Sequence, residues 1–131
     1  MIIDPLTKLY HRHGFYTLLT PLYSGLLRTP NAFALLMVDI DNLQHFNEQY
    51  GHLTGDKMIM LIAKKIIKTN RKSSICCRWR GGEFLIFCQG ISAEAAETLA
   101  RRINSEVAKK KKGNMLHITV SVGVYVTRAT D

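Results

Sequence analysis

The sequence predicts a single α+β domain, in which an antiparallel central sheet is flanked by helices and preceded by a further helix. After that first helix, strand-like and helix-like stretches follow in the order strand, helix, strand, strand, helix, strand. The second and third strand-like stretches are separated by a Gly81-Gly82 pair, which is typical of a hairpin turn. This order is the split βαβ, or ferredoxin-like, arrangement. A chain of 131 residues is long enough to give one such domain its own core.

The N-terminal third predicts a helix and then a buried strand. Residues 8–28 have the periodicity of an amphipathic helix or helix pair, which Pro21 interrupts with a kink or a fresh turn. The segment 29–31, with its own proline, is expected to end this helix. Residues 33–40, FALLMVDI, form a continuous apolar run that ends in an acid, as expected for a central strand buried on both faces.

Three further helices and a last strand are expected along the chain. A short helix runs from Asn42 to about Tyr50, and Gly51 separates it from a helix over residues 55–70 with one wide apolar face. Ser92 is suited to cap a helix over residues 93–110, which is acidic at its start and basic at its end. Gly113 and Asn114 stop that helix, and the β-branched stretch 117–127 forms the last strand.

The predicted topology brings two distant stretches together. The hairpin strands are residues 74–79 and 83–89, and the latter is expected to lie between the former and strand 33–40, antiparallel to both. The hairpin tip therefore lies beside Asp39, at the C-terminal end of the first sheet strand. Residues from both stretches are expected to form one site.

Composition narrows the class of protein. No apolar run approaches the roughly 20 residues of a membrane span, and the N-terminus lacks the features of a secretory signal. The chain is expected to be cytoplasmic, or the cytosolic part of a larger, membrane-anchored protein, with no membrane contact of its own. The three cysteines, Cys76, Cys77 and Cys88, fit neither a disulfide framework nor a CxxC metal site, so buried thiols are expected. The five histidines show no metal-ligand spacing.

The net charge of +8 is compatible with nucleotide phosphates, nucleic acid or anionic lipid as partners. Its densest cluster, Lys109–Lys112, lies near the end of a predicted helix. Cations are favourable at a helix C-terminus, so we expect a solvated helix end there.

Four stretches in order carry a resemblance to a known family. VDIDNLQHFNEQYGHLTGD, residues 38–56, resembles the DIDHFKxxNDxxGHxxGD signature of the GGDEF family of diguanylate cyclases. DPLTKLYHRHGF (4–15) resembles that family's opening DxLTGLxNRRxF, CRWRGGEFLIF (77–87) its RYGGDEF hairpin, and ITVSVGV (118–124) its closing VTVSIGV strand. Together the four motifs span nearly the whole chain.

The resemblance implies a ferredoxin-like, nucleotide-cyclase-like palm that acts in cyclic di-GMP signalling. In that family two domains meet face to face, each holding one GTP, and two divalent metals such as Mg²⁺ drive phosphoryl transfer to give cyclic di-GMP. The partners implied are GTP or a related guanine nucleotide, and a second copy or a partner signalling domain. Residues 1–131 would be a single GGDEF-type domain without the family's final helix, which carries a KxxxR phosphate-binding pattern.

The resemblance also assigns roles to individual residues. Asp39 matches the first metal ligand, and Ile40 contributes a backbone carbonyl to the metal. Asn47 and Asp56 match the pair that binds the guanine edge. Gly81 matches a glycine that lets the backbone approach the nucleotide. For Asp39, Asn47 and Asp56 a helix-capping or other structural role stays open.

Several positions depart from the family pattern. Aligned without gaps, Arg80 replaces the first signature glycine and Gly82 the acid that supplies the second metal ligand, so Mg²⁺ is expected to bind weakly, as a single ion if at all. Arg80 pairs with a phosphate, closes the site through an ion pair with Asp39 or Glu83, or is exposed at the surface. Gln44 replaces a phosphate-binding lysine, and RKSS at residues 71–74 lacks the aspartate of the RxxD inhibitory site.

Three hypotheses about function follow. The first is a catalytically silent domain that binds GTP or serves regulation and dimerisation. The second is an active cyclase in which Glu83 is the catalytic carboxylate and swings onto the metal. The third is an RNA-binding module, because RGGEFLIF matches the RNA-recognition pattern at Arg80, Gly81, Phe84 and Phe87. Nucleic acid is nevertheless an unlikely partner, since residues 38–56 have no role in that hypothesis.

Overall fold

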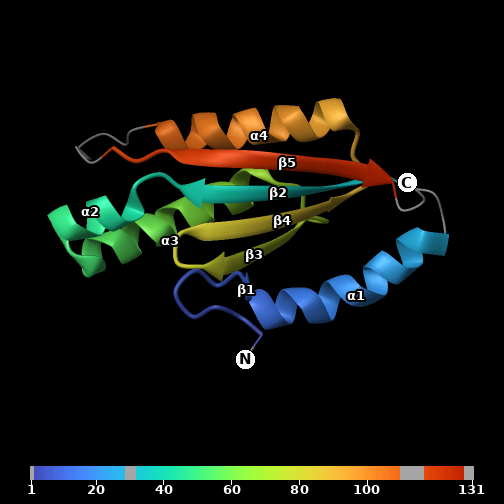
Figure 1. Cartoon of the computed structure of the whole chain (residues 1–131), viewed down its shortest axis with the longest axis horizontal. Helices are drawn as coiled ribbons and strands as arrows, with labels where there is room; N and C mark the ends of the chain where they lie inside the picture. The colour runs from blue at the N-terminus through green and yellow to red at the C-terminus, as the bar shows by residue number, and fades with distance from the viewer. Residues whose placement is uncertain (1, 29–31, 110–116, 129–131) are drawn as a thin grey trace.

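The computed structural model describes residues 2–28, 32–109 and 117–128. Its sheet has five strands in the order β1-β3-β4-β2-β5, and β4 lies between β3 and β2, antiparallel to both (Figure 1). The predicted α+β fold and βαββαβ order are therefore confirmed. The elements are β1 (Tyr10–His11), α1 (Arg12–Arg28), β2 (Ala32–Ile40), α2 (Leu43–Tyr50), α3 (His52–Thr69), β3 (Ile75–Arg80), β4 (Glu83–Gln89), α4 (Ala93–Ala108) and β5 (Val120–Arg128).

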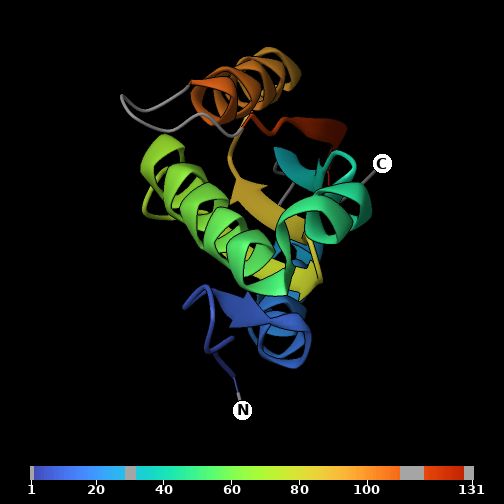
Figure 2. The ribbon, with the colours of Figure 1, turned by 90° about the vertical axis from the view of Figure 1, so that its left-hand side faces the viewer.

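Helices cover the two faces of the sheet unequally. Side chains of α3 and α4 pack on one face in a large core that includes Leu36, Ile62 and Ile103. Phe15 of α1 packs on the other face with Phe33 and two neighbouring strand residues, in a smaller core. The view along the strands shows α3 and α4 on the same side of the sheet (Figure 2). β2 was expected to be buried on both faces, which is wrong for its second half. The side chain of Met37 is 51% exposed, because the α1 cluster reaches only the first part of the strand.

Several element boundaries differ from those expected. Helix α1 begins at Arg12 rather than residue 8, because Tyr10–His11 first pair with β3 as the short strand β1. The helix then continues through Pro21. Helix α3 begins at His52, one turn before the predicted start, and Gly51 adopts a φ of 89° between α2 and α3. Such a left-handed backbone favours glycine. The segment 29–31 lies outside the described residues.

Helix α4 is capped at both ends. Ser92 Oγ accepts a hydrogen bond from Ala95 N at 3.1 Å, which confirms the predicted cap. At the other end, Lys65 of α3 donates hydrogen bonds to the carbonyl oxygens of Glu106 and Lys109, which satisfies part of the last turn. The helix ends at Ala108, two residues before the predicted end, and the predicted stop at 113–114 and Lys110–Lys112 lie outside the described residues.

The last strand is shorter at its start than expected, and the cysteines lie in the core or at its edge. Strand β5 begins at Val120, three residues later than expected, since residues 117–119 form no strand pairs. Cys77 and Cys88 are buried and Cys76 is half-buried, all with free thiols, as expected. Burial raises the pKa of Cys76 to about 12, so this thiol stays protonated and unreactive at neutral pH.

The N-terminal turn is anchored to the hairpin by an ion pair. Arg78 Nη1 lies 3.3 Å from Asp4 Oδ1, and Arg78 Nε donates to the carbonyl oxygen of Gly81 at 2.9 Å. Burial alone would raise the pKa of Asp4, but hydrogen bonds from Thr7 N and Oγ1, together with the Arg78 guanidinium, hold that pKa below its ordinary value. The turn and the hairpin tip are therefore held together by one arginine.

The Asp4 anchor predicts a specific pH dependence of stability. A carboxyl whose pKa is lowered by folding stabilises the fold above its unfolded pKa, about 4, and this stabilisation is lost as pH falls through the lower folded pKa. In urea denaturation between pH 6 and pH 2, we expect the Asp4→Asn variant to lose less stability on acidification than the parent chain. Parallel pH profiles for the two proteins would contradict the anchor.

Candidate functional site

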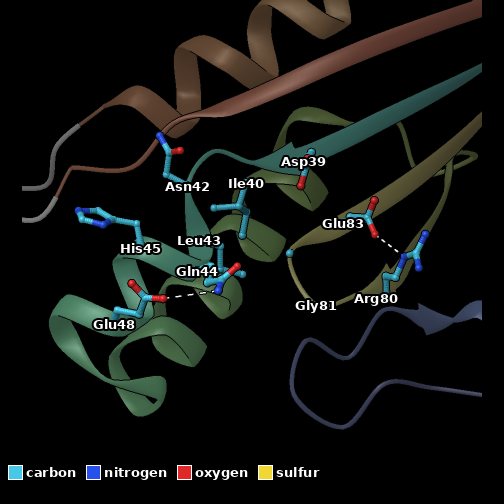
Figure 3. Close-up of a pocket in the computed structure, with 11 residues that line it drawn as sticks. Asp39, Ile40, Asn42, Leu43, Gln44, His45, Glu48, Arg80, Gly81 and Glu83 are labelled. Carbon is cyan, nitrogen blue, oxygen red and sulfur yellow. Dashed lines mark hydrogen bonds and ion pairs between the residues drawn. The ribbon is translucent and has the colours of Figure 1, made fainter.

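A cavity of about 670 Å³ opens where β2 ends, α2 begins and the hairpin between β3 and β4 turns (Figure 3). Two stretches distant in the sequence, residues 39–48 and the hairpin 80–83, line it together, as the predicted topology requires. The lining residues are Asp39, Ile40, Asn42, Leu43, Gln44, His45, Glu48, Arg80, Gly81, Gly82 and Glu83.

Backbone pairing fixes the position of the two carboxylates nearest the hairpin. Asp39 of β2 is the register partner of Glu83 of β4, and Ile40 N donates to the carbonyl oxygen of Gly82 at 2.9 Å. Directly opposed residues of antiparallel strands have Cβ atoms about 4.5–5.5 Å apart and point to the same face. Two acids therefore stand side by side at the cavity edge, and their like charges repel each other.

Arg80 compensates the charge of Glu83. Arg80 Nε donates to Glu83 Oε1 at 2.6 Å, with the two side chains 70% and 31% exposed (Figure 3). Of the partners considered for Arg80, the structure therefore selects Glu83. Among the described residues, the carboxylate of Asp39 has no hydrogen-bond or ion-pair partner, and this side chain is exposed. Asp39, which lies at the end of β2 beside the hairpin, is thus free to bind a ligand.

Asp41 has a structural role. Its Oδ2 accepts a hydrogen bond from Thr119 Oγ1 at 2.7 Å and its Oδ1 accepts one from Ser121 Oγ at 2.6 Å. These bonds hold the end of β2 against the start of β5 and occupy both carboxylate oxygens. Asp41 is therefore turned away from metal or nucleotide chemistry.

Removing this carboxylate should weaken the fold. Hydrogen bonds to a charged group contribute about 1.5–3 kcal/mol each, less where they are exposed. We expect Asp41→Ala to lower the free energy of unfolding by about 2 kcal/mol in urea denaturation. Glu97→Ala is the control, because the exposed Glu97–Arg101 ion pair spans 3.8 Å and should contribute under about 0.5 kcal/mol. Equal stability losses in the two variants would refute the structural role.

Asn47 and Asp56 lie apart from this cavity, at the contact of α2 with α3. Asn47 Oδ1 is buried without a hydrogen-bond partner among the described residues. A Cβ atom added to Gly55, the neighbour of Asp56, would collide with this oxygen. Asn47 lies inside α2, and Asp56 is in the second turn of α3, whose N-cap is Gly51. A capping role therefore does not account for either residue.

Capping does not account for Asp39 either, since the N-cap of α2 is Asn42 and makes no side-chain cap hydrogen bond. His45 and Glu48 line the cavity, although sequence reasoning gave them no role. Their i, i+3 spacing, which places them on one face of α2, was the available signal. Gln44 Nε2 lies 3.4 Å from Glu48 Oε1, so Gln44 stands at the cavity but brings no charge.

The residues corresponding to the inhibitory motif make other contacts. Arg71 Nη2 donates to the carbonyl oxygen of Gln89 at 2.8 Å, and Ser74 Oγ lies 3.5 Å from Cys88 Sγ. Arg71 and Ser74 therefore do not form the arginine–aspartate pair of an RxxD motif.

The cavity does not fit a pair of divalent cations. A hard cation such as Mg²⁺ binds through oxygen ligands, chiefly carboxylates. Asp39 and the Ile40 carbonyl are the matched ligands, but Glu83 is held by Arg80 and Gly82 has no carboxylate. Within the described ranges no group of three or more His, Cys, Asp or Glu side chains is arranged to hold a metal. Two adjacent cations would repel each other with little charge to offset them.

Comparisons with known proteins agree with this fold. The family model "Diguanylate cyclase, GGDEF domain" matches residues 1–131. Diguanylate cyclase A of Treponema denticola is 35% identical over 129 residues, covering 92% of this chain and 34% of that protein. Diguanylate cyclase DgcM of Escherichia coli K12 is 32% identical over 121 residues, covering 92% and 30%. The crystal structure of the coiled coil and GGDEF domain of DgcB from Caulobacter crescentus, in complex with c-di-GMP, is 26% identical, with a TM-score of 0.89 over 99% of this chain and 71% of that one.

Proposed function

The chain belongs to the GGDEF-domain family of diguanylate cyclases, and on that premise we propose that it is a catalytically silent, GTP-binding member of cyclic di-GMP signalling. The observation that carries the proposal is the Arg80–Glu83 ion pair. In this pair Arg80 neutralises Glu83, which is the acid that the hairpin contributes, while Gly82 has no carboxylate. Without a second carboxylate beside Asp39, the charge that develops during nucleotide transfer is not neutralised by a metal pair.

The GTP part of the proposal is supported by Asn47 and Asp56, which match the pair that binds guanine in the family pattern. Asn47 Oδ1 is buried against Gly55 without a partner among the described residues, and an unsatisfied buried polar atom costs about 1–3 kcal/mol. A rotation of the Asn47 side chain that brings this oxygen to a ligand donor would recover that cost. The N1 and exocyclic N2 groups of guanine are donors of the required kind. Asp56, one residue beyond the Gly55 contact, would accept from the same edge.

The proposal is tested by measuring product directly. Purified chain is incubated with GTP and Mg²⁺, and cyclic di-GMP is quantified by mass spectrometry beside an active family member at the same concentration. We expect product at least about a thousandfold below the active enzyme, because electrostatic stabilisation by a metal contributes several kcal/mol to such steps. A comparable rate would refute the silent domain.

An active cyclase is the second candidate, because the relatives of 32% and 35% identity are named diguanylate cyclases. In that case Glu83 leaves Arg80 and acts as the catalytic carboxylate. Asp39→Ala and Glu83→Ala separate the candidates: if the parent chain makes product and both variants abolish it, the active cyclase is correct.

The chain spans about a third of the length of these curated relatives, so the whole protein's activity and partners are part of the proposal. A homodimer or a partner signalling domain is the assembly that we propose, on the cytoplasmic side where GTP is available. Over the ranges that the structure describes, no helix has both the length and the apolar composition to cross a membrane.

A further inference from the structure

We propose that Arg80 is a fixed cation of this site and receives the triphosphate of a guanine nucleotide without a divalent metal. The inference rests on the proposed GTP-binding function and specifies which side chain binds the phosphates. The residues present do not fit a metal pair, because Gly82 lacks the carboxylate of a second metal ligand while Arg80 brings a cation to the same hairpin.

The charges around the cavity require a cation. Asp39 and Glu83 lie opposite each other on adjacent strands, Glu48 lines the cavity from α2, and all three acids would repel a triphosphate. Arg80 is the arginine among the lining residues, and its ion pair cancels the charge of Glu83 without the help of a metal. A Mg²⁺ ion placed at the same point would be repelled by the guanidinium.

Arg80 also has donors left over. Only its Nε atom contacts Glu83, and in the described part of the chain Nη1 and Nη2 have no hydrogen-bond partner. These two nitrogens carry four N–H groups in a planar fork, which matches two phosphate oxygens. Because Glu83 holds Nε, it fixes the plane of the fork while the side chain remains 70% exposed to an incoming ligand.

The opposite wall of the cavity supplies a second set of donors. Helix α2 spans eight residues and begins at Leu43, and its N-cap Asn42 makes no side-chain hydrogen bond to the first turn. The N–H groups of that turn are therefore open to an anion, which the helix dipole also favours. A Cβ atom added to Gly81 would meet nothing within 4 Å, so the hairpin backbone between the two walls is open as well.

Titration with a fluorescent GTP analogue tests the inference. The whole chain is titrated once in EDTA and once in Mg²⁺, and we expect dissociation constants that agree within about threefold. In EDTA, Arg80→Ala should weaken binding at least tenfold, whereas Glu83→Gln, which removes a competing carboxylate, should leave binding as tight or tighter. Arg101→Ala is the matched control, because Arg101 is 71% exposed and also pairs with a glutamate one helical turn away. Thermal melts confirm that each variant is folded.

The outcomes separate the two proposals. Binding that is at least tenfold weaker in EDTA, or equal affinity in Arg80→Ala and Arg101→Ala, overturns the role of Arg80 and leaves GTP binding intact. Loss of affinity in Glu83→Gln overturns it too, because the carboxylate would then be a ligand-binding group. No binding by the parent chain in either buffer overturns the GTP-binding function itself, and the inference with it.

Discussion

Replacing Arg80 by glycine and Gly82 by aspartate is expected to create a divalent-cation site. The double substitution removes the guanidinium, frees Glu83 and adds a third carboxylate near Asp39. Carboxylate oxygens that converge on one point are the ligands that Mg²⁺ and Mn²⁺ require. We expect Mn²⁺ affinity, measured by electron paramagnetic resonance titration, to rise at least tenfold over the parent chain.

The backbone of the hairpin can accept a side chain at position 82. Gly82 does not have a positive φ. A Cβ atom there would lie 2.8 Å from Leu43 Cδ2, the mobile end of a side chain, and 3.1 Å from Ile40 Cβ. Both Leu43 and Ile40 must therefore shift slightly to make room. Arg80→Gly alone should give an intermediate affinity. If the folded double variant binds Mn²⁺ no better than the parent, the missing carboxylate is not what prevents metal binding.

Replacing Gly55 by alanine is expected to disrupt both the α2–α3 contact and guanine binding. The added methyl group would collide with Asn47 Oδ1, which is buried. Overpacking of this kind costs about 1–3 kcal/mol, more than the roughly 1 kcal/mol that alanine gains in helix propensity over glycine. We expect a lower free energy of unfolding in urea and at least tenfold weaker GTP binding.

Two further variants isolate the collision. Gly123→Ala is the control, because a Cβ atom at this position of β5 would meet nothing within 4 Å, and its stability should change by less than about 0.5 kcal/mol. Adding Asn47→Ala to Gly55→Ala removes the colliding oxygen and should restore stability while GTP binding stays weak. Parent-like stability and affinity in the single Gly55→Ala variant would contradict both roles.

The order of the elements could be predicted from the sequence because it depends on local signals. Apolar periodicity, the Ser92 cap and the Gly81-Gly82 turn each act over a few residues, and together they fix the βαββαβ order. Strand β1 was missed because two residues have no periodicity to detect. The exposure of Met37 was missed because it depends on how far α1 reaches across the sheet.

The candidate site could be predicted only in part for the same reason. The convergence of Asp39 with the hairpin followed from topology. The partner of Arg80 did not, because a flexible side chain at a turn can reach several acids, and only the geometry selects Glu83. The contact between Asn47 and Gly55 depends on the packing of two helices, which residue spacing does not specify.

Because Arg80 neutralises Glu83 and Gly82 has no carboxylate, we expect that this site does not hold a pair of divalent cations. A crystal grown with Mn²⁺ and a non-hydrolysable GTP analogue, in which anomalous diffraction locates each metal ion, tests this expectation. We predict a bound nucleotide with no pair of Mn²⁺ ions between Asp39 and Glu83. Two adjacent Mn²⁺ peaks coordinated by Asp39 and Glu83, with Arg80 displaced, would show instead that the site does hold a metal pair.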